Sequence, residues 1–191
     1  MINHRDPAIR DICILWARSI LDKKHQYVVL DTETSGLDKN DVVLQIAIID
    51  LDGNGLLNSL IKPTKRKRIS PDATAVHGIR MSDLVNAPVF AGLVPQIEEI
   101  ISAKTVLIYN AEFDKRLINQ TCEQDKCRCV MMKAECVMIP YSRYIGKWSD
   151  YHSSYVYQRL PGGDHTAMGD CYATLEVIKK MARTGLRPQA T

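Results

Sequence analysis

No hydrophobic stretch in this chain is long enough to cross a membrane, which takes about 20 apolar residues. The longest apolar segment, residues 42–51, is interrupted by Gln45 and is typical of a buried strand. The sequence also has no internal repeat, and no secretory signal stands before its cysteines. We therefore expect a globular, cytoplasmic protein that does not associate with membranes.

Paired Cys-x-x-Cys spacings, which are typical of structural zinc sites, are also missing. The six cysteines are Cys13, Cys122, Cys127, Cys129, Cys136 and Cys171. We interpret them as reduced thiols of an intracellular protein, several of them buried as small apolar side chains. A zinc site made from Cys122, Cys127, Cys129 and Cys136 is the alternative that the sequence leaves open.

The 191 residues are 46% hydrophobic and 25% charged, which suits one domain that folds without a disulfide or a structural metal. The net charge of +3 points only weakly to an acidic partner, but its distribution is uneven. Between residues 62 and 68 the chain carries Lys62, Lys65, Arg66, Lys67 and Arg68. This basic run is either a solvated loop or a contact for phosphate groups.

The pattern of the first 62 residues predicts one helix and three strands. Apolar residues recur at helical spacing in residues 6–23 and place Ile9, Ile12, Cys13, Trp16 and Ile20 on one face. We expect this face to dock on the main domain, and partner binding is the alternative. Strands are predicted at 27–31, 42–51 and 56–62. The turn at 52–55 (DGNG) joins the last two, so these strands form an antiparallel meander.

The rest of the chain alternates between helices and strands. A short helix led by Pro71 runs into His77, and longer helices are predicted at 89–103, 111–122 and 166–182, the last with Ala173, Val177, Ile178 and Met181 as its apolar side. Strands are predicted at 105–109 and, as a short piece, at 129–132. This order predicts the α/β class with a mixed sheet flanked by helices. We divide the chain into an N-terminal helical extension (1–25), a main domain (26–184) and a flexible tail (185–191).

Acidic residues stand at the ends of several of these elements. Asp31 and Glu33 are two apart on a strand, so both side chains point to the same face and need either water or a cation between them. Asp114 is the fourth residue of a helix that Asn110 is expected to cap. Thr166 is expected to cap the last helix, which brings His165 beside Asp170. Four carboxylates at the carboxyl ends of strands could hold Mg²⁺ or Mn²⁺.

Three of these segments resemble the motifs of the DEDDh 3′→5′ exonucleases. They are LDTETSGL (30–37), NAEFD (110–114) and HTAMGD (165–170), and VHGI (76–79) is a further family segment. The resemblance runs from about residue 26 to residue 182. It departs from the family at Tyr109, where many relatives carry histidine. The basic run also contains more lysine and arginine than we expect at that place in the family. It implies an RNase H-like fold with a five-stranded mixed sheet, the meander plus parallel strands.

The resemblance also implies a role for each matched residue. Asp31, Glu33, Asp114 and Asp170 should hold two divalent cations, Mg²⁺ or Mn²⁺, with Asp31 bridging both. His165 should be the general base that takes a proton from the attacking water, since histidine titrates in a range that suits neutral pH. The product should be a nucleoside 5′-monophosphate. The terminal nucleotide should be bound by Thr32, Thr34, Leu37, His77 and Phe113.

The favoured function is therefore hydrolysis of single-stranded DNA from its 3′ end. An exoribonuclease that trims RNA is the nearest alternative, because no feature of the sequence indicates whether the 2′-OH is recognised. A module without catalysis that binds nucleic acid, or that belongs to a polymerase, is an alternative of another class. A polymerase or repair partner would fit the N-terminal helix, and both a monomer and a homodimer are compatible with the family.

Overall fold

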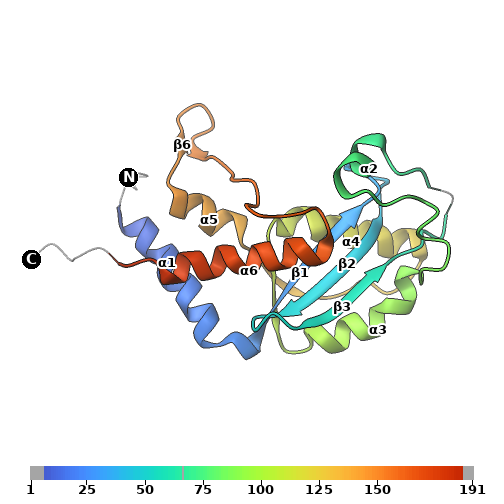
Figure 1. Cartoon of the computed structure of the whole chain (residues 1–191), viewed down its shortest axis with the longest axis horizontal. Helices are drawn as coiled ribbons and strands as arrows, with labels where there is room; N and C mark the ends of the chain where they lie inside the picture. The colour runs from blue at the N-terminus through green and yellow to red at the C-terminus, as the bar shows by residue number, and fades with distance from the viewer. Residues whose placement is uncertain (1–6, 66, 187–191) are drawn as a thin grey trace, which may run out of the picture.

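The computed structural model describes residues 7–65 and 67–186, and its centre is a five-stranded sheet (Figure 1). The strands are β1 (Tyr27–Thr34), β2 (Val43–Asp50), β3 (Gly55–Leu60), β4 (Thr105–Ile108) and β5 (Lys133–Cys136), in the order β3-β2-β1-β4-β5. The β1–β2 and β2–β3 pairs are antiparallel, whereas β1–β4 and β4–β5 are parallel. The predicted mixed sheet, a meander extended by parallel strands, is confirmed.

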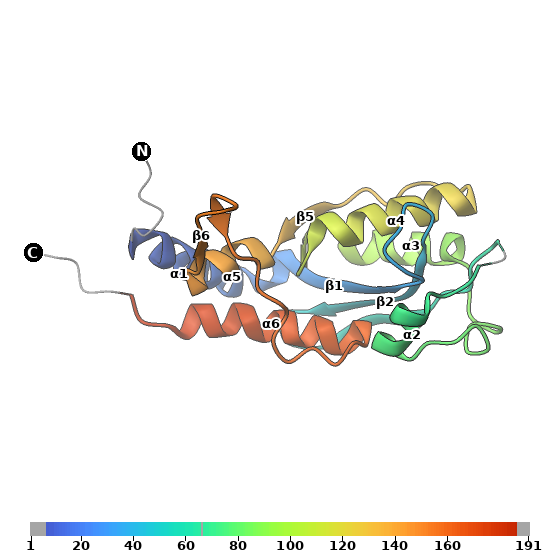
Figure 2. The ribbon, with the colours of Figure 1, turned by 90° about the horizontal axis from the view of Figure 1, so that it is seen from above.

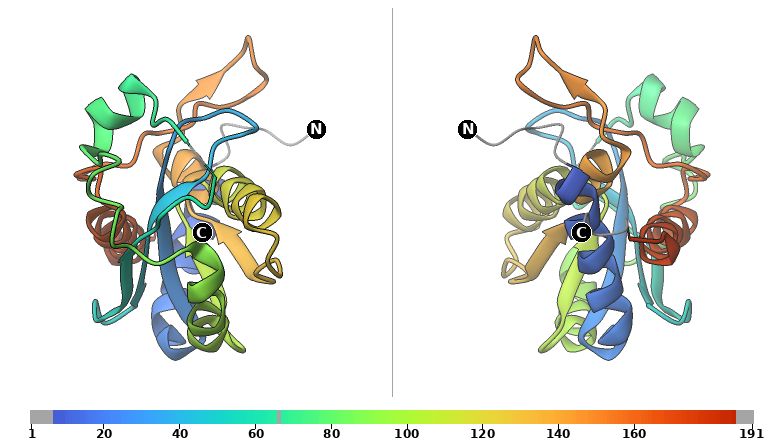
Figure 3. Two further views of the ribbon diagram at one scale, coloured as in Figure 1. Left: turned by 90° about the vertical axis from the view of Figure 1, so that its right-hand side faces the viewer. Right: turned by 90° about the vertical axis from the view of Figure 1, so that its left-hand side faces the viewer.

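Helices cover both faces of this sheet, as the two rotated views show (Figures 2 and 3). One face carries α3 (Phe90–Ile101) and α4 (Ala111–Asp125). The other carries α1 (Pro7–Asp22), α5 (Met138–Ile145) and α6 (Ala167–Arg183). The fold is therefore three-layered, with a separate apolar core on each side of the sheet.

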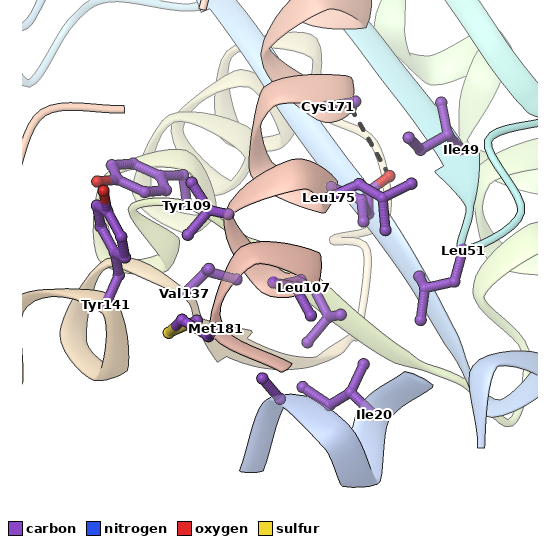
Figure 4. Packing of buried hydrophobic residues seen from close by; sticks show 14 of the residues in the cluster. Ile20, Ile49, Leu51, Leu107, Tyr109, Val137, Tyr141, Cys171, Leu175 and Met181 are labelled. Carbon is purple, nitrogen blue, oxygen red and sulfur yellow. Dashed lines mark hydrogen bonds between the residues drawn. The ribbon is translucent and has the colours of Figure 1, made fainter. Parts of the chain in front are cut away.

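The alternation of side chains along the strands divides the apolar residues between the two cores. In β1, Val29 packs on the side of α6, while Val28 and Leu30 pack on the side of α3 and α4. Figure 4 shows the α6 side, where the buried Cys171 and Leu175 lie against β2. The Cys171 thiol donates to the carbonyl oxygens of Ala47 at 3.5 Å and Val29 at 3.7 Å. The predicted apolar side of this helix, listed above, is buried.

The N-terminal helix α1 docks on α5 and α6, as predicted. Its docking face consists of the buried residues Cys13, Ile14, Ala17 and Ile20. The assignment of Ile12 to that face is wrong, since its side chain is 63% exposed. Both Ile12 and Ile14 are compatible with a helix, and the packing of α1 on α5 and α6 decides which of them is covered.

The remaining elements in the first hundred residues follow the sequence closely. The turn after β2 is held by the Asp50 carboxylate, which accepts from the main-chain N–H groups of Asp52 and Asn54. A short 3₁₀ helix, η1 (Lys24–Gln26), leads into β1. Helix α2 (Pro71–His77) starts with proline, is capped by the Ser70 side chain and ends at Gly78, which has a positive φ of 74°.

The structure corrects the prediction for residues 126–166. The expected strand at 129–132 is wrong, because β5 lies at Lys133–Cys136. The prediction also lacked α5 and the small hairpin of β6 (Trp148–Ser149) and β7 (Ser154–Tyr155). The expected tail at 185–191 lies mostly outside the described residues, as does residue 6, the first of the expected N-terminal helix. None of the described helices is both long and apolar enough to span a membrane.

Candidate active site

The site is built around β1, whose alternating side chains point toward two helices. Asp31 and Glu33 share the side of Val29 and therefore face α6. There Asp170, in the first turn of α6, completes a group of three carboxylates, and one oxygen atom from each lies within 4.8 Å of the other two. The strand extends to Thr34, so both of its carboxylates lie inside β1 rather than at its end.

Asp114 approaches from the opposite side of β1. It is the fourth residue of α4 and is 4% exposed. Thr32 points toward α4, and its hydroxyl donates a hydrogen bond of 2.7 Å to the Asp114 carboxylate. Asn110 occupies the predicted N-cap position, although its side chain makes no capping hydrogen bond. Strand β1 thus carries two candidate metal ligands, Asp31 and Glu33, and orients a third, Asp114, through the Thr32 hydroxyl.

Crowding and burial change the protonation of these carboxyl groups. Burial, followed by the negative charges of Asp114, Asp170 and Glu33, raises the pKa of Asp31 well above its ordinary value. Burial also raises the pKa of Glu33 to about 8. The pKa of Asp114 is raised to about 7 by burial, and the hydrogen bond from Thr32 opposes this rise. A bound cation would relieve the same repulsion and favour the ionised carboxylates.

The site therefore fits divalent cations with oxygen ligands. Asp31, Glu33 and Asp170 are the one group of at least three potential metal ligands that converges in residues 7–65 and 67–186. The four cysteines considered as zinc ligands form no such group in those residues. Cys122 is buried, whereas Cys129 is exposed, so their thiols do not share one environment.

His165 and Asp170 stand on either side of the start of α6. Thr166 caps this helix as predicted, with its hydroxyl accepting from the N–H of Gly169 at 3.0 Å. His165 is exposed and has a left-handed backbone with φ of 61°, a conformation that is uncommon outside glycine. Its main-chain N–H donates to Asp170 Oδ1 at 3.2 Å. The strained residue is thus tied directly to a candidate metal ligand.

The loop before α6 requires a glycine next to Asp170. A Cβ atom added at Gly163 would lie 2.6 Å from Asp170 Oδ1, closer than such contacts occur. Asp170 therefore keeps its position only if residue 163 has no side chain.

The five predicted nucleotide-binding residues lie in different environments. Thr32 and Thr34 are buried, and the Thr34 hydroxyl donates to the Gly36 carbonyl. His77 uses both ring nitrogens on the main chain: Nδ1 accepts from Ile79 N–H, and Nε2 lies 3.0 Å from Thr34 O. Leu37 is 75% exposed. Their role in nucleotide binding remains a prediction.

Phe113, the fifth of these residues, is half-buried, and the Arg116 guanidinium lies 5.3 Å above its ring. It lines a hollow of about 320 Å³ together with Met138, Ile139 and Tyr157. These three neighbours were missed in the sequence, because no motif or periodicity marks them. They lie in the segment whose elements were predicted least well.

Tyr109, the residue that departs from the family pattern, is buried at the end of β4. Its hydroxyl donates a hydrogen bond of 2.8 Å to the Gln158 carbonyl. It therefore holds the segment that leads to His165 against the sheet.

Comparison with known proteins agrees with this geometry. A sequence model of the exonuclease family that is named after RNase T matches residues 28–178 of this chain. The "uncharacterized exonuclease CP81" of Escherichia phage 186 is 32% identical over 174 residues, which cover 83% of this chain and 89% of the phage protein. The DNA polymerase III subunit epsilon of Escherichia coli is 30% identical over 98 residues, covering 46% of this chain and 39% of the subunit. The chain thus spans less than half of that subunit.

Two solved structures share the fold. Exonuclease X in complex with 5′ overhanging duplex DNA has a TM-score of 0.55 at 24% identity, over 84% of this chain and 95% of that chain. Escherichia coli exonuclease I in complex with a dT13 oligonucleotide has a TM-score of 0.64 at 17% identity, over 82% and 41%. At these identities the likeness concerns the arrangement of the elements.

Proposed function

The chain belongs to the DEDDh family of 3′→5′ exonucleases, and from this premise we propose that it hydrolyses single-stranded DNA from the 3′ end and releases nucleoside 5′-monophosphates. The observation that carries the proposal is the convergence of the Asp31, Glu33 and Asp170 carboxylates within 4.8 Å beside the buried Asp114. A protein that only binds nucleic acid has no need for such a costly group of like charges.

In this proposal Asp31, Glu33, Asp114 and Asp170 hold two divalent cations, either Mg²⁺ or Mn²⁺. When bound, such ions lower the pKa of the attacking water and stabilise negative charge on the attacking and leaving oxygens. Asp31 would supply a ligand at the centre of this group, where burial and the negative charges of the other three carboxylates raise its pKa. The Thr32 hydroxyl holds the Asp114 carboxylate, which would be a further ligand for the ions.

His165 accepts the proton of the attacking water and thus acts as the general base. Its exposed position at the start of α6 leaves the imidazole open to solvent and substrate. The hydrogen bond from its main chain to Asp170 fixes its place relative to the carboxylates. Leu37 and Phe113 bind the base of the terminal nucleotide, because stacking on apolar and aromatic side chains tolerates any base.

DNA is proposed as the substrate because several relatives named above are DNA enzymes by name or were solved with DNA. Matched DNA and RNA oligomers of one sequence, labelled at the 5′ end, test this choice directly. A ladder of shortened products that appears at least tenfold faster for DNA supports it. Equal or faster degradation of RNA would assign the enzyme to RNA trimming.

A polymerase partner is a separate proposal, which rests on the likeness to the epsilon subunits. Deleting residues 1–25 would not test it, because α1 contributes Ile14 and Ile20 to the core. Ile12→Ser and Leu15→Ser are better variants, since these side chains are 63% and 51% exposed on α1. Loss of polymerase association in both variants, with unchanged melting temperature, would place the partner there.

A further inference from the structure

The basic run predicted from the sequence has no part in the mechanism above, yet it helps to form a second hollow on the molecule. Lys65 and Lys67 from this run and Lys39 from the loop after β1 line a space of about 340 Å³. The side chains of Gln120, Glu123 and Gln124 on α4 form its other wall. We name the space with its three lysines the lysine hollow.

A series of side-chain hydrogen bonds along α4 connects the lysine hollow to the candidate active site. Arg116, two residues after Asp114, donates to Gln120 Oε1 at 2.8 Å and to the Leu37 carbonyl at 3.2 Å. Gln120 donates to the Asp41 carbonyl at 2.9 Å, and Gln124 to the Asn40 carbonyl at 2.8 Å. Side chains on the outer face of α4 thus bind the loop at residues 37–41. This loop extends from the candidate active site to the lysine hollow.

The basic loop is held at the same end of α4. The Thr64 hydroxyl donates a hydrogen bond of 2.6 Å to Asp125, the last residue of the helix. The ammonium group of Lys67 donates to the Asn40 carbonyl. Two loops that are distant in sequence therefore present their lysines side by side, so the cluster is a product of the fold.

The charges in the lysine hollow are not neutralised by ion pairs. Within residues 7–65 and 67–186, the salt bridges join Lys24 to Asp52, Arg128 to Glu98, and Lys179 to Glu176. Glu123 is the acidic residue lining the hollow, so three lysines and one glutamate leave a charge of about +2. Lysine ammonium groups around one space form a binding site for phosphates, which accept hydrogen bonds and carry negative charge.

The distance along α4 suits a nucleic acid that also reaches the active site. Asp114 and Gln124 are ten residues apart, which corresponds to about 15 Å along a helix. One duplex strand places a phosphate every ~3.4 Å along its axis, so roughly four phosphates span this distance, and fewer do in an extended strand. The lysine hollow therefore lies within reach of the same strand, a few nucleotides from the bond that is cleaved.

We propose that the lysine hollow binds the phosphate backbone of the strand being cleaved, a few nucleotides on the 5′ side of the scissile bond. This inference rests on the proposed exonuclease function and deepens it by adding a second contact. This contact keeps the enzyme bound to the strand after each terminal nucleotide has been released. It also predicts that short substrates are cleaved less efficiently than long ones.

The experiment compares a triple variant, Lys39→Gln, Lys65→Gln and Lys67→Gln, with the wild-type protein. Two substrates are used: a single-stranded dT20 oligonucleotide and the p-nitrophenyl ester of thymidine 5′-monophosphate, which is too short to reach the hollow. For dT20, kcat/KM should fall at least tenfold at ~0.1 M salt, and its dependence on log salt should become shallower by about 2, or ~0.7 for each lost contact. The rate with the ester should not change.

Two single variants serve as controls. Lys180→Gln removes one lysine from the last turn of α6, far from α4, and should leave the dT20 rate unchanged. Glu123→Gln removes the acidic group of the hollow and should increase kcat/KM for dT20.

The outcomes separate this inference from the proposed function. If wild-type protein hydrolyses neither substrate with Mg²⁺ or Mn²⁺, the proposed function fails. If wild type is active and the triple variant retains its full rate and salt dependence on dT20, the lysine hollow is not a strand contact. An equal loss on both substrates would show that the lysines act on the active site itself.

Discussion

The two helices that bring carboxylates to β1 hold them in different ways. Asp114 is nearly inaccessible, lies within α4 and receives a hydrogen bond from Thr32. Asp170 is half-buried at the start of α6, and the loop before it contains the strained His165 and the crowded Gly163. The α4 side is thus fixed by the core, whereas the α6 side depends on a loop of unusual backbone. We therefore expect substitutions on the α4 side to weaken ion binding and substitutions on the α6 side to slow catalysis.

The largest effect should come from Asp31, which serves both sides. Asp31→Ala removes the carboxylate at the centre of the cluster, so binding of ions and activity should be lost together. We expect kcat to fall by about 10⁴-fold or more, since the ions contribute several kcal/mol to the reaction. Calorimetric titration with Mn²⁺ and rate measurements on one protein preparation test both losses. If Asp31→Ala still bound Mn²⁺ tightly, Asp31 would not be a central metal ligand.

On the α6 side, His165→Ala should lower kcat by about 10²–10⁴-fold, because a general base is lost. The carboxylates stay in place, so Mn²⁺ should bind as in the wild type. Rates in single-turnover experiments and calorimetric titration distinguish the two properties. A full rate in this variant would exclude His165 as the base.

Gly163→Ala tests the close contact within the α6-side loop. The added methyl group would displace Asp170, and a shift of about 1 Å can reduce a rate by ~10²-fold. We expect such a fall in kcat. Gly92→Ala is the matched control, because a Cβ atom there meets nothing within 4 Å, and its rate should be unchanged. Equal rates in both variants would mean that the loop adapts and that its backbone is not critical.

On the α4 side, Thr32→Val removes the hydroxyl that donates to Asp114. Loss of a partner that orients a metal ligand typically weakens ion binding by about 10–100-fold, and we expect the lower end of this range with little change in kcat at saturating ion. Thr174→Val is the control, since the buried Thr174 hydroxyl has no hydrogen-bond partner among the described residues. Titration with Mn²⁺ should distinguish the two variants, and similar affinities would contradict the orienting role.

The smallest effect concerns stability in the absence of ions. The pKa of Glu33 is raised from 4.5 to about 8 in the folded protein, so the folded state retains a proton that the unfolded chain releases. Its stability should therefore decrease as pH rises from about 4.5 to about 8, and we expect the ion-free protein to melt a few degrees lower at the upper end. Mg²⁺ should reverse the trend, because it favours the ionised carboxylates. Melting curves with EDTA that are independent of pH would contradict the raised pKa.

The same contrast explains what could be predicted from the sequence. The start of α4 and the start of α6 were placed correctly, because capping residues and family motifs coincide there. The meander was predicted from the turn after β2, whose Asp50, Asn54 and Gly53 act through local hydrogen bonds and backbone conformation. These signals are local, so the sequence carries them without knowledge of the fold.

The segment between α4 and α6 has no such signals. Edge strand β5 has the sequence KAEC, which offers no apolar run. Helix α5 is eight residues long and contains Pro140. The hairpin strands β6 and β7 have two residues each, and the rings of Trp148 and Tyr155 pack across them with their centroids 5.2 Å apart. Here packing against the rest of the fold decides the structure, so Tyr157 and the hollow beside Phe113 were not foreseen.

The most direct test of the central claim uses single-stranded DNA with a label on its 3′-terminal nucleotide, incubated with Mg²⁺, Mn²⁺ or EDTA. The account predicts that the label is released at the earliest times as a nucleoside 5′-monophosphate with either ion, and that nothing is released in EDTA or by Asp31→Ala. Intact DNA after incubation with protein that binds Mn²⁺ would contradict the account and favour a role in nucleic-acid binding alone.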